Sequence, residues 1–296
     1  MKKKLIIAVT VIAVAVAGAY LVIRYHAEQK TRRQVESIAL RIPYVTGIDY
    51  ASTAIDWPAA VLRVEKVTVS LGDPAETVAV DEVIVRDVDP AHDVPDRLDV
   101  EIHGIHLSSG QPRLQGFQPY LAEAGYKELV IDLHLAYRYD RDSRLLEIEK
   151  LEAAADDAGT LSFSARFNNV DLPRLLKNLT DRIYLITALP GVSLSGAELS
   201  YADDTLTRRL LEVWGRRTQQ SPGETARSLS VTLENRFGPT DRPLTRQALA
   251  GLKAFIAAPG TLRVAAAPPE PVSFLRFLWT RNPSDVVELL HIQVRS

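Results

Sequence analysis

Apolar and polar residues alternate along the middle of the chain in one recurring eight-residue pattern. Residues 62–69, 78–85 and 100–107 each read apolar, any, apolar, polar, polar, apolar, any, apolar, and residues 146–153 follow the pattern more weakly. A period of two is typical of a strand with one buried face. The two successive polar residues would move the later apolar residues to the other face of a regular strand. Either a bulge returns them to the first face and bends the sheet, or the strand passes between two buried environments.

Turn residues separate these strands, and two further strands follow the same period. They are expected at residues 129–139 and 160–167, next to turns at residues 140–143 and 156–159. Strands that are joined in sequence by short turns form an antiparallel meander. The sequence therefore predicts a twisted antiparallel sheet in the region 47–168.

Helical periodicity is more frequent in the region 169–296, which we expect to be a mixed α/β region packed on the same sheet. Asp204 is the expected N-cap of a helix over residues 205–217, whose apolar stripe includes Val213 and Trp214. Residues 228–237 fit a helix or a strand equally well. The remaining elements expected from the pattern are helices at residues 115–124, 171–188, 243–258, 272–280 and a last turn from 283, with strands at residues 192–202, 261–266 and 290–294.

The N-terminus carries three lysines followed by an uncharged run, residues 5–23. As a helix this run is about 28 Å long, close to the ~30 Å hydrocarbon core of a bilayer. Residues 15–17 resemble a signal-peptide cleavage site, but the apolar run continues beyond them to Ile23. We therefore expect an uncleaved transmembrane anchor, with a cleaved signal peptide as the alternative. Residues 24–43 are expected to continue as a helical stalk.

Orientation does not follow from charge, because basic residues flank the apolar run on both sides. The lysines packed against the run resemble a bacterial signal anchor. We therefore expect residues 1–4 in the cytoplasm, a single pass through the bacterial inner membrane, and the bulk of the chain in the periplasm. The expected fold class is α+β, with an N-terminal transmembrane helix, then a twisted antiparallel β-sheet with helices packed on it in the second half.

Composition excludes several classes of protein. The chain has 296 residues, of which 46% are hydrophobic and 24% charged, and no cysteine. Such a chain is globular, and it has no disulfide framework, thiolate metal site or cysteine nucleophile. The net charge of −2 argues against a generally basic nucleic-acid binder, and we expect no nucleic-acid partner.

The charges are segregated along the sequence. Residues 1–33 have a net charge of +6, residues 49–157 of −13 and residues 158–296 of +5, which places a soft boundary near Ala158. Two solvated faces of one fold explain this distribution. The alternative is a basic surface that meets anionic headgroups or an acidic partner. Arg208, Arg209, Arg216 and Arg217, on one predicted amphipathic helix, are the candidates for such a membrane-surface contact.

Residues with catalytic or metal-binding chemistry are few. The chain has no glycine-rich phosphate loop, no His-Glu-x-x-His and no Gly-x-Ser-x-Gly motif. With the proposed bulge, His103 and His106 would share a face that His134 could approach from another strand, and three histidines form a zinc-like site. Scattered surface histidines or a pH-sensitive patch explain the same residues. Three aspartate pairs, Asp140/Asp142, Asp156/Asp157 and Asp203/Asp204, fit turns and helix caps better than glycoside hydrolysis.

The layout resembles the AsmA-like group of bacterial envelope proteins, which have one N-terminal span and a long twisted sheet. The stretches that carry the resemblance are residues 2–23, 47–50, 62–71, 78–87 and 96–107. The resemblance covers about the first half of the chain, and the helix-rich second half departs from a simple repeating groove. It implies a non-catalytic protein that handles lipid or assists outer-membrane assembly, with the bilayer, a phospholipid and an envelope protein as expected partners and no cofactor.

The apolar positions of the strands supply candidate lipid-facing residues. These are Val64, Val80, Ile102, Leu133 and Phe163. Their alternative role is core packing against helices of the second half. Two other functions also remain open, a structural or adaptor subunit of an envelope complex and an anchored hydrolase that uses the histidines or a carboxylate pair.

Overall fold

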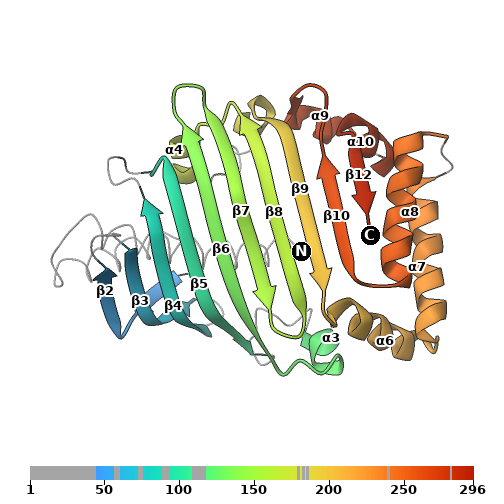
Figure 1. Cartoon of the computed structure of the whole chain (residues 1–296), viewed down its shortest axis with the longest axis horizontal. Coiled ribbons are helices and arrows are strands. Elements are labelled where there is room, and N and C mark those ends of the chain that lie inside the picture. The colour runs from blue at the N-terminus through green and yellow to red at the C-terminus, as the bar shows by residue number, and fades with distance from the viewer. Residues whose placement is uncertain are drawn as a thin grey trace. The chain divides into compact units, whose positions relative to one another are not determined.

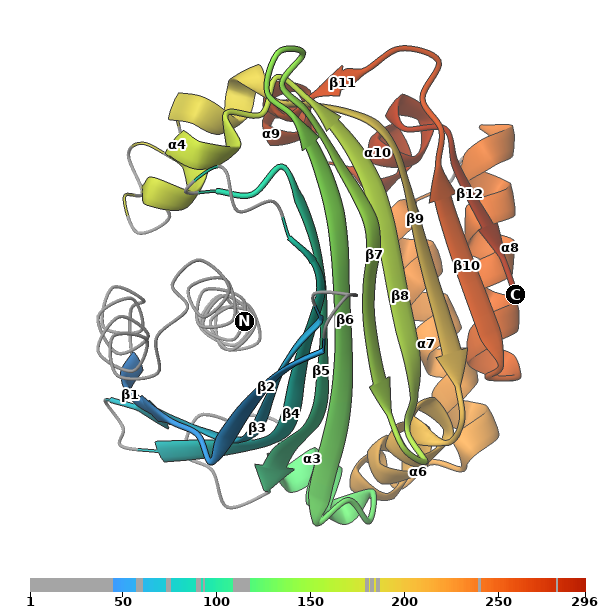
Figure 2. The ribbon, with the colours of Figure 1, turned by 60° about the vertical axis from the view of Figure 1, so that its left-hand side comes forward.

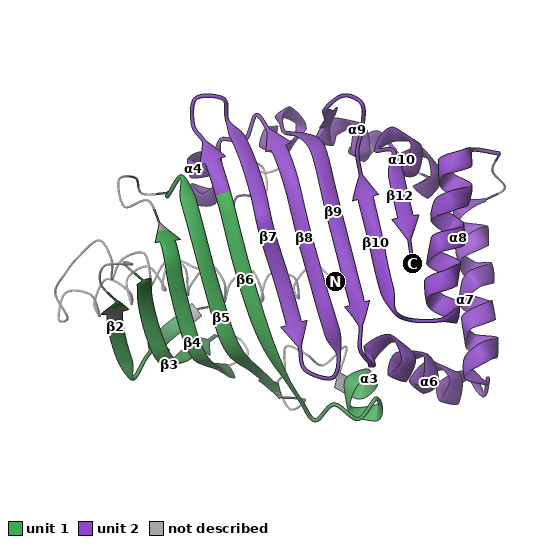
Figure 3. Ribbon diagram, in the orientation of Figure 1, with its two compact units in different colours: residues 1–137 green, residues 138–296 purple. Residues whose placement is uncertain are grey.

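The computed structural model describes residues 45–56, 61–72, 76–88, 92, 94–108, 118–178, 181, 184, 187–238, 241–280 and 282–296. The chain divides into two compact units, unit 1 with residues 1–137 and unit 2 with residues 138–296 (Figure 3). The division falls inside a strand of the sheet, earlier in the sequence than the change of charge near Ala158.

Unit 1 is an antiparallel meander (Figure 1). Its neighbouring strands are β1, β3, β4, β5 and β6 in that order, and β2 also pairs with β3. The strand β6 runs across the boundary into unit 2. The elements are β1 (Val45–Asp49), β2 (Ser52–Asp56), β3 (Val61–Leu71), β4 (Glu76–Val88), β5 (Arg97–Ser108), α3 (Gln118–Glu123) and β6 (Glu128–Asp140).

One feature of the backbone crosses three adjacent strands at the same level. Lys66 of β3 and Gly104 of β5 have left-handed φ angles of 53° and 66°, and Asp81 of β4 lies between them. The pairs Glu65↔Glu82 and Val67↔Val80 flank this level with unchanged register, as do Glu82↔His103 and Val80↔Ile105. All three strands therefore contain the extra polar residue side by side, which we call the aligned break.

The aligned break decides between the two explanations of the recurring pattern. A bulge would set two residues of one strand against one of its neighbour, and the register would shift. Here the register is kept, because each strand carries the same insertion. In β3, Val64 and Val67 on either side of the break are both buried, whereas Glu65 and Lys66 are both exposed. The two apolar halves of the strand thus lie on one face.

The result is one continuous aliphatic surface on β3, β4 and β5, which we call the apolar strip. Each of its side chains is at most 8% exposed. Rows of paired residues such as Val64↔Val83↔Ile102 cross the three strands. The strip consists of Leu62, Val64, Val67, Val69, Leu71, Val78, Val80, Val83, Val85, Leu98, Val100, Ile102 and Ile105.

Unit 2 continues with strands and a layer of helices. Its strand order is β7, β8, β9, β10 and β12, and β11 pairs with β9. The strands are β7 (Leu145–Ala155), β8 (Gly159–Asn168), β9 (Ser193–Asp203), β10 (Thr261–Ala266), β11 (Val272–Ser273) and β12 (Ile292–Arg295). The helices are α4 (Leu172–Lys177), η2 (Leu189–Gly191), α6 (Leu206–Thr218), α7 (Pro222–Phe237), α8 (Pro243–Ala257), α9 (Phe274–Trp279) and α10 (Pro283–Leu289).

The helices of unit 2 cover its sheet directly. The helix α8 packs on β12 and β10, and α7 packs on α8 (Figure 2). At Gly251 of α8 an added Cβ would lie 2.8 Å from the Val294 side chain, so glycine allows the helix to approach β12 closely. Ala248, Val287 and Val294 form the buried centre of this contact. Within unit 2, α8 and α10 therefore pack on the strands beside them.

Polar contacts fix the ends of these helices. The Glu288 carboxylate of α10 accepts hydrogen bonds from the backbone N–H and the hydroxyl of buried Thr245, at 3.3 and 3.1 Å, in the first turn of α8. Asp203, rather than the expected Asp204, accepts the N–H of Thr207 at the start of α6. The residue Trp214, expected on the buried stripe of α6, is 51% exposed.

The described part of the chain holds no helix that is long and apolar enough to cross a membrane. Its longest helix, α7, has 16 residues, about 24 Å at 1.5 Å per residue, which is shorter than a ~30 Å hydrocarbon core. The expected fold class, with a transmembrane helix and signal anchor as its first element, is therefore corrected to a β-rich fold of antiparallel sheet and helices. The predicted segments 1–4, 5–23 and 24–43 lie outside the described residues.

The aligned break makes glycine necessary at position 104. In a Gly104→Ala variant the new Cβ would lie within 2.1–2.8 Å of Asp81 side-chain atoms at a left-handed φ. We expect a loss of about 1–3 kcal/mol in the free energy of unfolding, measured by urea denaturation followed by circular dichroism. Gly223→Ala, where nothing lies within 4 Å, is the control and should not destabilise the chain. Equal stability of the two variants would contradict this account.

The contact between α10 and α8 gives a second prediction. Glu288→Ala leaves the buried N–H of Thr245 without its acceptor, and we expect a loss of about 1–3 kcal/mol in unfolding free energy. The matched change Glu234→Ala removes only a partly exposed ion pair with Lys253, which is worth about 0–1 kcal/mol. Thermal and urea unfolding of both variants measure the difference, and a Glu288 variant no weaker than the Glu234 variant would refute the role assigned to Glu288.

Candidate functional site

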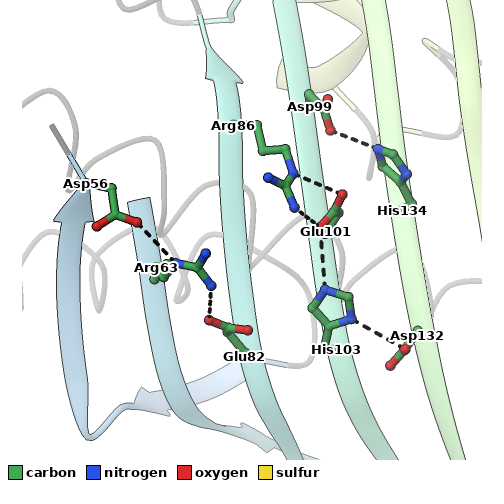
Figure 4. Close-up of polar contacts among 9 residues, drawn as sticks. All are labelled: Asp56, Arg63, Glu82, Arg86, Asp99, Glu101, His103, Asp132 and His134. Atoms are coloured by element: carbon green, nitrogen blue, oxygen red, sulfur yellow. Dashed lines mark hydrogen bonds and ion pairs between the residues drawn. The ribbon is translucent and has the colours of Figure 1, made fainter. Parts of the chain in front are cut away.

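The face of unit 1 opposite the apolar strip carries a network of histidines, carboxylates and arginines, drawn in part in Figure 4. Contacts run across neighbouring strands, from Asp56 of β2 to His134 of β6. We call this network the histidine–carboxylate surface. Its members are Asp56, Arg63, Asp81, Glu82, Arg86, Asp99, Glu101, His103, His106, Glu128, Asp132 and His134.

The aligned break places His103 and His106 on the same face. Nδ1 of His103 lies 3.4 Å from Asp132, and Nδ1 of His106 lies 3.0 Å from Glu128. Glu128 and Asp132 are four residues apart on a strand with a period of two, so they share one face of β6. Residues three apart on β5 can both reach that face because Gly104, between them, has a left-handed φ.

Two carboxylates hold His106 from opposite sides. Its Nε2 lies 3.2 Å from both oxygens of Asp81 on β4, while its Nδ1 faces Glu128 on β6. Both ring nitrogens can donate only in the protonated imidazolium. The hydrogen bonds to Asp81 and then to Glu128 accordingly raise the pKa of His106 above its ordinary value of 6.5. In that form His106 ties three strands together beside the break.

Two arginines of the network bind glutamates on neighbouring strands. Arg86 lies where the register of β4 and β5 shifts, which marks a bulge, and its guanidinium binds both Glu101 oxygens at 3.0 and 2.6 Å. The hydrogen bond from Arg86 lowers the pKa of Glu101. Arg63 donates to Glu82 at 2.9 Å. Ile84 pairs with Arg63 and with Glu101 on either side and is buried among these charged neighbours.

The three predicted histidines do not converge on one point. His103 contacts Glu101 and Asp132, His134 contacts Asp99 at 2.8 Å, and His106 has its own pair of carboxylates. Among the described residues no group of three or more histidine, aspartate or glutamate side chains is placed to hold a metal ion. The three histidines instead contact separate carboxylates, so the arrangement is a set of ion pairs between neighbouring strands.

The candidate lipid-facing residues separate into two groups. Val64, Val80 and Ile102 belong to the apolar strip, and Leu133 of β6 is 9% exposed. Phe163 instead lies in unit 2, where it packs against the cluster of Ala165, Leu194, Val272 and Leu290. Core packing therefore accounts for Phe163. The other four are buried.

The candidate membrane-surface arginines all lie on α6. Arg209 forms a 2.5 Å ion pair with Asp157, and Arg208 donates to the carbonyl of Asp204 at 3.2 Å. Arg216 and Arg217 are exposed in the last turn, where positive charge complements the helix dipole. Arg209 thus anchors the start of α6 to the β7–β8 turn, whereas Arg208 bonds to the residue two positions before the helix.

The aspartate pairs have structural roles where their contacts are described. Asp140 accepts the N–H groups of Asp142 and Ser143 at 2.9 and 3.2 Å, and these contacts lower the pKa of Asp140. Asp157 holds Arg209, and Asp203 caps α6. Asp140 thus has the turn role that was predicted, whereas the residue that caps α6 is Asp203 and not the expected Asp204.

Sequence reasoning did not single out Asp81, Glu128 or Asp132 as members of a network. They lie far from the histidines in sequence, and only the pairing of strands brings them together. A usable signal was present for α7, which the pattern left ambiguous. Ser221 and Glu224 form a capping box at its N-terminus, readable as Ser-x-x-Glu.

A comparison with protein-family models finds a similarity in the second half of the chain. A protein-family model described as "Uncharacterized protein" matches residues 152–296. This stretch begins in β7 and lies entirely within unit 2. No curated protein matches the chain. The apolar strip and the histidine–carboxylate surface both lie outside the matched residues.

The two-sided contact of His106 predicts a specific pH dependence. A pKa raised in the folded state means that His106 contributes stability below its unfolded pKa of about 6.5, and that this stability is lost as the pH rises through the folded pKa. We expect the His106 resonances in an NMR titration to report a pKa above 6.5, and Asp81→Asn to lower it.

His106→Asn should flatten the fall of stability with rising pH in the neutral range. A His106 pKa at or below 6.5 would show that the two carboxylates do not act on the ring as described.

Proposed function

We propose that the chain is a non-catalytic binding protein that takes up the acyl chains of a phospholipid on the apolar strip of unit 1. The observation that supports this proposal is the chemistry of the strip. It contains valine, leucine and isoleucine alone, with no aromatic ring and no hydrogen-bonding side chain. Such a surface offers only dispersion and desolvation, which suit an alkyl chain better than any polar ligand.

The shape of the strip also fits a lipid. The strands β3, β4 and β5 have 11, 13 and 12 residues, which corresponds to about 36–43 Å at 3.3 Å per residue. Three strands span about 10 Å from first to last. A long, narrow aliphatic surface of this size accommodates extended acyl chains along its length.

The polar groups on the opposite face of the same strands stabilise the pairing of the strands. On that face, carboxylates contact histidines and arginines of neighbouring strands, so the polar groups hold the strands in register. The aligned break lets both surfaces exist on one bent sheet. The histidine–carboxylate surface is therefore assigned to the shape of the binding face and not to chemistry on a ligand.

The first experiment uses the full chain. A phosphatidylglycerol carrying a diazirine in its acyl chain is mixed with the protein and irradiated, and the labelled peptides are identified by mass spectrometry. We expect label in peptides from β3, β4 and β5. Label confined to unit 2, or no label above that of an unrelated control protein, would refute the proposal. Equal labelling by a diazirine fatty acid would reassign the ligand to free acyl chains.

A matched pair of variants locates the contact on the correct face. Ile102 belongs to the strip, and Ile84 is a similarly buried isoleucine on the opposite face of the same strands. We expect Ile102→Asn to reduce photolabelling about tenfold and Ile84→Asn to reduce it far less. Circular dichroism of both variants checks that each retains the sheet. Equal loss in two folded variants would contradict binding on the strip.

A further inference from the structure

One end of the sheet in unit 2 carries exposed apolar side chains. The strands β8, β9 and β11 are aligned there, because Asn168 and Ser273 both pair with Ser193. The elements that connect to this row are α4, which follows β8, η2, which precedes β9, and α9, which follows β11. Figure 3 shows α4 and α9 at this end of the purple strands. The helices η2 and α9 are in contact and expose three large apolar side chains, which we call the leucine–tryptophan patch: Leu189, Leu275 and Trp279.

Helix α9 is attached to the sheet on its inner side. The N–H of Phe274 donates to the carbonyl of Val192 at 2.9 Å, and the Ser273 hydroxyl donates to the carbonyl of Pro190 at 2.6 Å. The ring of Phe274 also stacks on Phe167 of β8, with 6.1 Å between the ring centroids. These contacts bury one side of α9 and leave its other side chains to project from a fixed base.

Trp279 projects furthest, since it is 79% exposed. It follows Leu275 by four residues, so the two side chains lie on the same side of the helix. Large apolar side chains that are exposed together mark an interaction surface. A side chain that projects this far enters a partner rather than enclosing a small ligand. The boundary between the headgroups and the acyl chains of a bilayer accepts such side chains, and tryptophan is enriched there.

The charges beside the patch favour an anionic partner. The charged residues of α4 and α9 are Arg174, Lys177 and Arg276, and all three are basic and exposed. Helix α4 also exposes Leu176 between its two basic residues. Basic side chains next to large apolar ones are typical of a surface that binds anionic lipids. A symmetric contact between two copies of this end would instead bring like charges together.

We infer that the leucine–tryptophan patch docks unit 2 on the surface of an anionic phospholipid membrane. Leu275 and Trp279 enter the boundary between headgroups and acyl chains, and Arg276 contacts the headgroups. This docking goes beyond the acyl-chain binding proposed for unit 1 and does not depend on it. The apolar strip binds single lipid molecules, whereas the patch holds a membrane surface.

A fluorophore at one position tests the docking, because the chain has no cysteine of its own. Leu275→Cys in the full chain carries a nitrobenzoxadiazole group, and Val231→Cys, a similarly exposed position on α7, is the matched control. The vesicles contain phosphatidylcholine with or without phosphatidylglycerol, and some of the lipids carry a doxyl quencher in the acyl chain. We expect quenching at position 275 by vesicles with phosphatidylglycerol, severalfold stronger than at position 231. The fluorophore reports on its own surroundings, so attachment of the chain elsewhere does not produce this signal.

Two further changes in the Leu275→Cys chain separate the apolar contribution from the charged one. Trp279→Ser should reduce the quenching severalfold, whereas Trp214→Ser, at the exposed tryptophan of α6, should leave it unchanged. Arg276→Gln should also reduce it severalfold, whereas Arg246→Gln, at an exposed position of α8, should not. Added salt should weaken the quenching, because it screens the attraction to the headgroups. Circular dichroism checks that each variant retains its fold.

Three results would overturn the docking. The first is quenching at position 275 no stronger than at position 231. The second is equal quenching by vesicles with and without phosphatidylglycerol. The third is a blue shift of the fluorophore at position 275 without vesicles that grows with protein concentration, which would assign the patch to a contact between copies of the chain.

The photolabelling of the apolar strip separates this docking from the proposed function. Quenching at position 275 without acyl-chain label in β3, β4 and β5 would uphold the docking and refute lipid binding by unit 1. Label in these strands without quenching at position 275 would uphold lipid binding by the strip and refute the docking.

Discussion

The aligned break of unit 1 is the constraint on which its two surfaces depend. A left-handed residue in a single strand would create a bulge and shift the register. Because Lys66, Asp81 and Gly104 lie side by side, the register of β3, β4 and β5 is kept through this level. The neighbouring strand on the other side of β3 is interrupted at the same level, because β1 and β2 pair with successive parts of β3 and the gap between them lies opposite Lys66. Aliphatic side chains then gather on one face and charged ones on the other.

The two faces contribute unequally to stability. Each exposed ion pair of the histidine–carboxylate surface is worth about 0–1 kcal/mol, whereas burial of one valine, leucine or isoleucine contributes about 1.5–3 kcal/mol. Because its side chains are buried, the apolar strip supplies most of the stability of unit 1. The polar network contributes specificity of register, because Arg86, His103 and His106 each find their partners only when neighbouring strands are aligned as observed.

The sequence predicted the strands well, because alternation is a local property. The predicted strand at residues 261–266 is β10 itself, and the predicted helix from Pro243 is α8. The alignment of the breaks was not predictable, since it depends on register between strands distant in sequence. For the same reason the sequence did not show which carboxylates contact the histidines. Trp214 was assigned to a buried stripe because helical periodicity identifies an apolar side chain without showing whether a neighbour covers it.

The strongest hydropathy signal in the sequence, residues 5–23, gave the prediction of a transmembrane helix, which was then corrected. An uncharged run of nineteen residues satisfies the length of a bilayer span, but the criterion measures only the need for an apolar environment. Unit 2 shows the ordinary solution, in which α8 and α10 cover the sheet beside them. In unit 1 the side chains of the apolar strip are buried as well, and a ligand on the strip must compete with that burial.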